Sequence, residues 1–290
     1  MGGSLLLWRK DMKNMKLSFV LCFLLLGQAV GAEPNEGYLG LFGPRNFEIG
    51  PEIFHHRYAE PGVMKDKGMM YGLYWSYTDR RWLTPPSQEN EYEAPVKKPA
   101  QWMVGIDGSV AFGEVDYDGA LMDGTPYKVE NMDNWLFEAR LLAGPDFPKE
   151  TRIDTIYSGL GFRYLNNDGS SDPAGYTRES RYWYLPVGVT TLGKLGDCGW
   201  SVGCTAEFDI LLYGEQTSHL HDLGGDVDNR QHEGYGARGS IRLCKKGPKS
   251  NFIIEPFVRY WQIQTSAESM GFVEPKNETT EVGVRFLWRF

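Results

Sequence analysis

The last nine residues of the chain, 282–290, constrain its fold more than any other stretch. Apolar and aromatic side chains occupy the even-numbered positions Val282, Val284, Phe286, Trp288 and Phe290, whereas the opposite face carries Gly283, Arg285 and Arg289. Successive side chains of a β-strand point to opposite faces of the sheet. A strand that has lipid on one face and a polar lumen on the other shows this alternation. The segment therefore predicts a strand of a transmembrane β-barrel.

Residues 1–32 have the features of a secretory signal peptide. Lys13 and Lys16 precede an apolar run over residues 17–26, and the small-residue exit Val30-Gly31-Ala32 follows. A basic start, a short apolar core and a small-residue exit are the three parts of such a leader. The apolar run is about ten residues long, which is shorter than a membrane-spanning helix requires. We therefore expect cleavage after Ala32 and a single barrel domain over residues 33–290.

The charge of the mature chain argues against nucleic acid as a partner. Residues 1–32 hold four of the 30 basic residues and one of the 38 acidic residues, so residues 33–290 keep 26 and 37, a formal net charge of −11. Nucleic-acid binding needs a basic surface. The 16 tyrosines, 15 phenylalanines and 9 tryptophans, with 35 glycines, favour a β-rich chain over a helical one.

Ten segments of the mature chain show a two-residue hydrophobic period. Lengths of about ten residues suit tilted spanning strands. The fold class that we predict is all-β, an antiparallel transmembrane β-barrel with ten strands; eight and twelve strands are the alternatives. The ten segments are 46–58, 69–78, 101–115, 134–143, 155–165, 181–192, 199–213, 234–244, 251–263 and 280–290.

The connections between these segments alternate in length, as they do in membrane barrels. Short turns are expected at 193–198 and 245–250, on the same side as both termini. The segment 79–100 is an exception, because it is long, rich in proline and glutamate, and falls on that same side. Long polar loops are expected on the other side, at 59–68, 116–133, 166–180, 214–233 and 264–279.

Two parts of the chain resemble outer-membrane β-barrel proteins of Gram-negative bacteria, of the porin and outer-membrane-protein-A types. One is the hairpin formed by 157–165 (YSGLGFRYL), Gly175-Tyr176 and 178–188 (RESRYWYLPVG). The other is the C-terminus, where Phe286, Trp288 and Phe290 resemble the signal that the barrel-assembly machinery reads. The resemblance implies an outer-membrane location, contact with lipid and lipopolysaccharide, and insertion by that machinery. It implies little about activity.

The lumen of a ten-stranded barrel is narrow, and side chains fill it, whereas open aqueous channels are typical of sixteen or more strands. The segments 199–213 and 234–244 should pair, which places Glu207 and Asp209 opposite a strand with Arg238 and Arg242. Buried charges need partners. We expect a structural ion-pair network, with a transport path as the alternative. Other inward positions with charge are Glu138, Arg140, Glu255, Arg259, Glu281, Arg285 and Arg289.

The mature chain has three cysteines, Cys198, Cys204 and Cys244. The periplasm is oxidising, so pairing is expected. Cys204 has the lipid-facing parity of Trp200, whereas Cys244 has the lumen parity of Arg242, and side chains on opposite faces of a sheet cannot bond. We therefore predict a Cys198–Cys244 disulfide, with three free thiols as the alternative.

The loop 214–233 holds the metal-binding candidates His219, His221, Asp222 and His232. Imidazoles two residues apart on an extended segment point the same way, and histidine with carboxylate suits zinc. The loop has no tight ligand-spacing motif, so a solvated polar loop is favoured. We expect no metal and no other cofactor.

Two histidines and two aspartates are the candidates for catalysis. His55 and His56 lie near the outer end of the first strand, and Asp116 and Asp118 near the outer end of the third. The family resemblance implies that such residues at the rim can serve a hydrolase, although the chain has no GxSxG nucleophile motif. We therefore predict a non-enzymatic barrel, either a narrow channel or a structural or surface-binding protein. The alternative is an outer-membrane hydrolase (a protease, an esterase or a lipid A deacylase) with its site at the outer rim.

Overall fold

The computed structural model describes residues 45–80, 101–121, 124–149, 151–172, 175–196, 198–220 and 225–290. The predicted signal peptide 1–32 and residues 81–100 of the long segment lie outside these ranges. The described part of the chain forms eleven strands: β1 (Arg45–Glu60), β2 (Met64–Asp79), β3 (Gln101–Ala120), β4 (Pro126–Pro148), β5 (Arg152–Asp168), β6 (Thr177–Leu195), β7 (Trp200–Leu220), β8 (Gly225–Gln231), β9 (Gly234–Lys245), β10 (Asn251–Ile263) and β11 (Asn277–Arg289).

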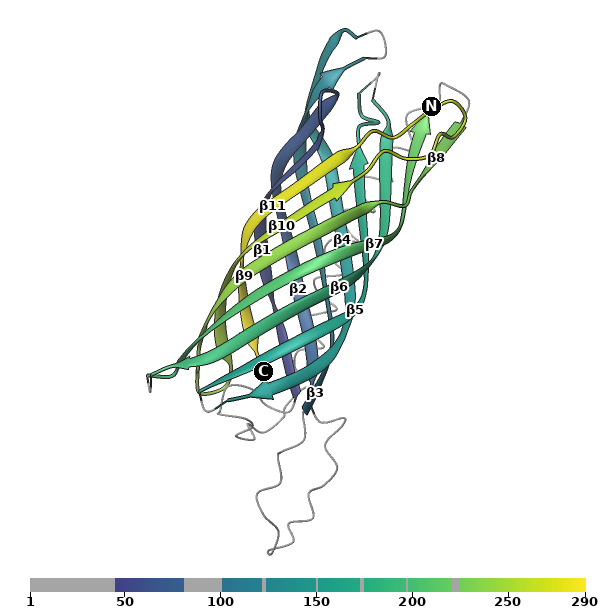
Figure 1. The fold of residues 1–290 in the computed structure, drawn as a ribbon. Helices are drawn as coiled ribbons and strands as arrows, with labels where there is room; N and C mark the ends of the chain where they lie inside the picture. The colour runs from purple at the N-terminus through teal and green to yellow at the C-terminus, as the bar shows by residue number, and fades with distance from the viewer. Residues whose placement is uncertain are drawn as a thin grey trace, which may run out of the picture.

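Ten of these strands close into an antiparallel barrel (Figure 1). Strands β1 to β7 pair with one another in chain order. Strand β7 then pairs with β9, β9 with β10, β10 with β11, and β11 with β1, which closes the ring. The predicted ten-stranded antiparallel barrel is confirmed. We call the end with the β1–β2 turn the mouth and the end with Phe290 the base.

Strand β8 lies outside the ring of ten, and it corrects the prediction of a loop over 214–233. It forms a hairpin with the last seven residues of β7, where Gly214 pairs with Gln231 and Leu220 with Gly225. The first half of β7 pairs with β9, up to Ile210 opposite Tyr235. The end of β7 therefore continues past its neighbour β9, and β8 satisfies the backbone groups that would otherwise form an exposed edge.

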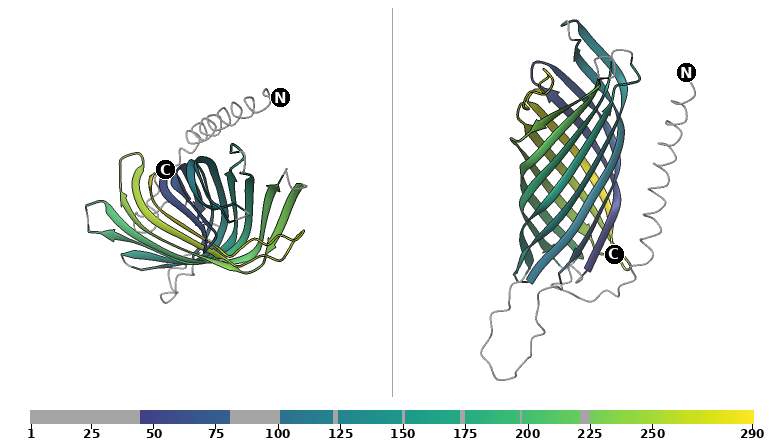
Figure 2. Two further views of the ribbon diagram at one scale, coloured as in Figure 1. Left: turned by 90° about the horizontal axis from the view of Figure 1, so that it is seen from above. Right: turned by 90° about the vertical axis from the view of Figure 1, so that its right-hand side faces the viewer.

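The strands are longer than predicted, mainly at the mouth. Strands β1 to β7 have between 16 and 23 residues, although about ten suffice to cross a membrane. The predicted loop 59–68 shrinks to a turn at 61–63, because Glu60 pairs with Met64 and the ladder continues below them. The predicted loop 116–133 shrinks in the same way, because Ala120 pairs with Pro126. The barrel is therefore a tall cylinder of tilted strands (Figure 2).

The barrel is apolar outside and charged inside, as its last strand predicts. Val282 is 55% exposed and Trp288 42% exposed on the outer wall, whereas Arg285 and Arg289 are buried in the lumen. The same outer wall carries apolar residues from most other strands, and a surface of this kind is stable against lipid and not against water. Examples are Trp102, Val104, Ile106, Leu141, Ile156, Leu160, Val187, Val189, Phe208, Ile210, Leu212, Ile241 and Leu243.

No helix among the described residues has the length and apolar character needed to cross a membrane.

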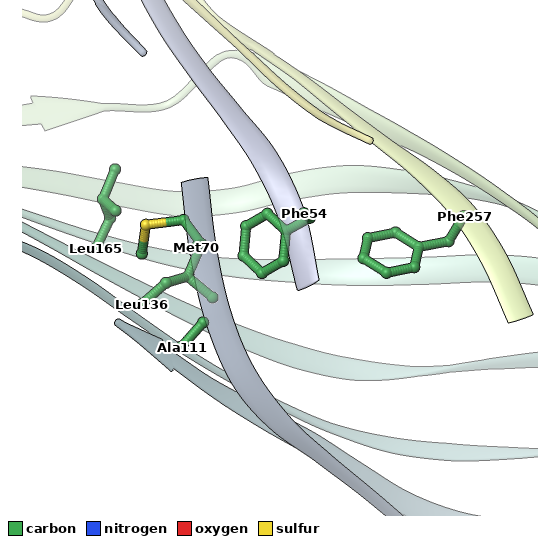
Figure 3. Packing of buried hydrophobic residues seen from close by; sticks show 6 residues of the cluster. All are labelled: Phe54, Met70, Ala111, Leu136, Leu165 and Phe257. Atoms are coloured by element: carbon green, nitrogen blue, oxygen red, sulfur yellow. The ribbon is translucent and has the colours of Figure 1, made fainter. Parts of the chain in front are cut away.

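An apolar layer fills part of the lumen (Figure 3). The rings of Phe54 and Phe257 meet edge to face with their centroids 6.0 Å apart. Both rings also lie against the guanidinium carbon of Arg259, at 4.9 and 4.7 Å from their centroids. The layer thus packs directly on the charged residues of the lumen. Its other members, Met70, Ala111, Leu136 and Leu165, come from β2, β3, β4 and β5.

Candidate functional site

The lumen gathers charged side chains from nearly every strand of the barrel, since alternate residues of each strand point inward. All the inward charged positions named from the sequence make lumen contacts. The predicted pairing of segments 199–213 and 234–244 is confirmed by β7 and β9, which place Glu207 directly opposite Arg238. The side chains form three layers, at the centre, the base and the mouth.

The central layer is a set of four charged residues, Glu138, Arg163, Arg259 and Glu281, which we call the central square. Glu281 accepts an ion pair from Arg163 at 2.5 Å and from Arg259 at 2.6 Å. Arg259 also lies 3.5 Å from Glu138. All four side chains are at most 4% exposed.

The central square spans the barrel from wall to wall. Arg163 lies on β5 and Glu281 on β11, and these strands are five places apart in the ring of ten, in either direction. Glu138 on β4 and Arg259 on β10 are also five places apart. The Arg163–Glu281 and Arg259–Glu138 pairs therefore join diametrically opposite walls, whereas Arg259 and Glu281 are direct partners on the neighbouring strands β10 and β11.

Two more arginines extend the network toward the base. Arg238 lies 2.8 Å from Glu138, 2.8 Å from Glu207 and 3.0 Å from Asp209. Arg140 pairs with Asp107 at 2.8 Å and with Glu207 at 2.6 Å. Each carboxylate in this group thus faces at least one guanidinium group.

The basal layer surrounds a cavity of about 160 Å³. Arg285 pairs with Glu52 at 2.9 Å and with Glu255 at 3.4 Å. Glu48 faces Arg242 at 3.0 Å and Arg289 at 2.7 Å. The cavity walls therefore carry guanidinium groups that are already engaged by carboxylates.

The mouth has a separate group of polar residues. Arg178 on β6 pairs with Glu60 on β1 at 2.8 Å, again between strands five places apart. Tyr58 contacts Glu60 and Glu274, and Glu274 belongs to the connection between β10 and β11. The lumen is thus bridged from wall to wall at the mouth as well as at the centre.

The structure does not bring the four candidate catalytic residues together. His56 is fully buried in the lumen, with Nδ1 3.1 Å from Glu281 Oε1, whereas His55 faces the opposite, outer side of β1. Asp118 lies on the outer surface between Lys65 and Lys128, at 3.1 and 3.3 Å. Asp116 is exposed and accepts a hydrogen bond from the backbone of Asn131. Neighbouring positions of a strand point to opposite faces, so His55 and His56 cannot share the rim site of the hydrolase alternative.

Of the four candidate metal ligands, the structure describes His219 and His232, which contact different neighbours. His219 lies on the outer wall, with Nδ1 2.9 Å from Asp226 and Nε2 3.6 Å from Glu179. His232 packs against the ring of Tyr213. The remaining candidates, His221 and Asp222, lie outside the described residues. Within the described ranges, no three His, Cys, Asp or Glu side chains are grouped closely enough to hold a metal ion.

The predicted Cys198–Cys244 disulfide is not formed, and the three cysteines of the described chain are free thiols. Cys244 is buried in the lumen with Tyr74 and Ile253, whereas Cys198 is exposed in the turn before β7. The thiol of Cys198 instead donates a hydrogen bond to the backbone oxygen of Leu195 within the turn, at 3.2 Å. Cys204 faces outward, as its parity predicts.

Sequence reasoning missed several lumen residues, namely Glu48, Glu52, Arg163 and the inward face of His56. The signal was present, because Glu48, Glu52 and His56 share one parity of β1 with the core residue Phe54. Glu274 carried no such signal. It lies outside the strands, and only the folded chain places it beside Tyr58.

Comparison with known proteins identifies the fold. No protein-family model and no curated protein sequence matches the chain. The outer membrane protease OmpT from Escherichia coli matches with a TM-score of 0.55 and 11% identity, over 86% of this chain and 98% of that one. The transport unit of the autotransporter AIDA-I from Escherichia coli matches with a TM-score of 0.40 and 9% identity, over 93% and 97%. Neisserial surface protein A matches with a TM-score of 0.32 and 12% identity, over 84% and 97%. At 11% identity the likeness to OmpT concerns the fold alone, and together with the closed ring of ten strands it shows that the chain has the fold of an outer-membrane β-barrel.

Proposed function

We propose that this protein is a non-enzymatic outer-membrane barrel with a structural or surface-binding role and a lumen closed to solutes. One observation carries the proposal: ion pairs join diametrically opposite walls at the central square and again between Arg178 and Glu60 at the mouth. An ion that passed through would have to separate buried charges from their partners. Removing one partner from such a pair costs about 3–5 kcal/mol, and several pairs lie on the path.

A hydrolase has less support. OmpT is a protease with the same fold, but one fold hosts many functions, and activity has to be argued from a site. The four rim candidates lie on different faces of the wall. His56 faces Glu281, which two arginines also contact, so this carboxylate is already engaged in ion pairs.

Conductance across a planar lipid bilayer tests the closed lumen. We expect the refolded wild-type barrel to insert without producing current steps in concentrated potassium chloride. Insertion is checked separately by the mobility shift between unheated and heated samples on a denaturing gel. Uniform current steps from the inserted wild-type protein would contradict the proposal and favour the narrow channel instead.

The location is part of the proposal. The apolar outer wall suits a lipid bilayer, and the features of residues 1–32 suit export with cleavage after Ala32. The partners that we propose are the lipid and lipopolysaccharide of the outer membrane and the assembly machinery that reads Phe286, Trp288 and Phe290. Trp288 and Phe290 are 42% and 44% exposed at the base, where a lipid-facing signal has to lie.

A further inference from the structure

The connection 264–276 between β10 and β11, which we call the mouth segment, folds against the mouth of the barrel. Asn229 of β8 donates hydrogen bonds from its side-chain amide to the carbonyl oxygens of Ala267 and Phe272, at 3.2 and 3.0 Å. The backbone N–H of Ala267 donates to Arg230. These bonds hold the tip of the segment, and Glu274 anchors its other end inside the mouth.

Tyr58, Glu60 and Glu274 together form the anchor of the mouth segment. If both carboxyl groups are ionised, the anchor lacks one of the protons that its two hydrogen bonds need. The phenol oxygen of Tyr58 lies 3.1 Å from Glu60 Oε1 and 3.1 Å from Glu274 Oε1. A phenol has a single O–H to donate, and an ionised carboxylate can only accept. The second contact is therefore a hydrogen bond only when one of the two carboxyl groups carries a proton and donates it to Tyr58.

The charges around the anchor point the same way. From β1 it is faced by Tyr58 and Glu60, and from β6 by Arg178 and Tyr182. On β2, Asp66 lies 3.6 Å from the same Arg178. The guanidinium group of Arg178 is thus the cation near three carboxyl groups, those of Glu60, Asp66 and Glu274. Each of these three residues is at most 7% exposed. The neighbour from β7 is the neutral side chain of Gln216.

We propose that Glu60, Tyr58 and Glu274 form a proton-binding site whose occupation holds the mouth segment in place. The bound proton removes one of the negative charges and completes both contacts of Tyr58. The site lies at the mouth, on a different layer from the central square, so it works whether or not the lumen conducts.

The pKa of Glu274 supports this site. Burial, together with the nearby charge of Glu60, raises the pKa of Glu274 from 4.5 to about 7, and Arg178 opposes the rise. A detached segment exposes this carboxyl group and lets it ionise near its ordinary pKa. The attached state therefore binds the proton more tightly, is favoured at acid pH and weakens as the pH rises from about 4.5 to about 7. Above that range the ratio of attached to detached segment is lower by on the order of a hundredfold and stays constant.

Amide hydrogen exchange of the refolded full-length barrel, followed by mass spectrometry at pH 5.5 and pH 8, tests the site. After correction for the intrinsic exchange rate, peptides from 264–276 should lose protection at least tenfold at pH 8, while peptides from the centre of β11 should not change. Glu274→Gln imitates the protonated acid, so its mouth segment should stay protected at both pH values.

A matched control is Glu268→Gln, which neutralises an exposed carboxyl group in the same segment and should behave as wild type. Tyr58→Phe should lower protection at pH 5.5, because it removes the group that binds both acids. Folding of each variant is confirmed by its mobility shift on a denaturing gel. Equal wild-type protection at both pH values, or a pH-dependent loss that persists in Glu274→Gln, would overturn the proposal.

Discussion

Replacing Phe286 with aspartate should reduce barrel insertion at least tenfold, whereas Arg289→Ser should reduce it much less. Phe286 lies on the outward face of β11 and pairs in register with Ile254 of β10. A charge on the lipid face of a barrel costs up to a few kcal/mol near the middle of the membrane. Arg289 points into the lumen, where its partner Glu48 keeps Arg242 at 3.0 Å after the substitution. The readout is the fraction of heat-modifiable barrel in outer-membrane preparations.

Deletion of Phe290 belongs to the same experiment. The backbone of Phe290 exchanges two hydrogen bonds with Phe47 at the seam between the first and last strands, at 2.9 and 3.3 Å. Phe290 is also the last of the three residues of the proposed assembly signal. We expect the deletion to lower insertion more than Arg289→Ser does. Wild-type yields from both the deletion and Phe286→Asp would contradict a membrane barrel that ends at this strand.

Glu281→Leu should be the most destabilising change in the lumen, by about 3–5 kcal/mol, because it leaves buried cations without their carboxylate. Glu281 receives Arg163 at 2.5 Å, Arg259 at 2.6 Å and His56 Nδ1 at 3.1 Å. After the substitution Arg259 keeps Glu138 nearby, but Arg163 loses its ion-pair partner. The side chain of Arg163 is only 2% exposed, so water cannot replace that partner. The measurement is the urea midpoint of the refolded barrel in lipid vesicles.

The matched control is Glu278→Leu on the same strand. Glu278 is 29% exposed and pairs with Lys276 at 3.2 Å near the mouth. Partly exposed pairs of this kind contribute about 1 kcal/mol or less. The midpoint of Glu278→Leu should therefore stay close to wild type. Equal shifts for the two variants would mean that the central square does not stabilise the barrel.

Most of the barrel could be predicted from the sequence because the two-residue period records which face each side chain takes. The alternation of Val282, Phe286 and Trp288 with Arg285 and Arg289 predicted which face of β11 meets lipid, and a slip of one residue would put both arginines into lipid. The ends of the strands were harder to predict from the sequence. Polar residues at the mouth can continue a ladder or form a loop with the same pattern, as the turn at 61–63 shows.

The candidate site could be predicted only in part, since contacts across the lumen depend on the closure of the ring. Pairs on neighbouring strands, such as Glu207 with Arg238, follow from parity and strand order. Arg163 and Glu281 are 118 residues apart in sequence and meet because a ring of ten strands places β5 opposite β11. The hypothesis of a shared site for the two histidines failed for a local reason. His55 and His56 are adjacent on β1, so they lie on opposite faces of the barrel wall.

The intact mass of the protein recovered from outer-membrane fractions tests the central claim most directly. The claim is that this chain is exported and closes into a barrel with an apolar outer wall. We expect a chain that begins at Glu33, sediments with the outer membrane and changes its gel mobility only after heating. Recovery of the full chain from Met1 in the cytosol, without a mobility change on heating, would contradict the export and the membrane barrel together.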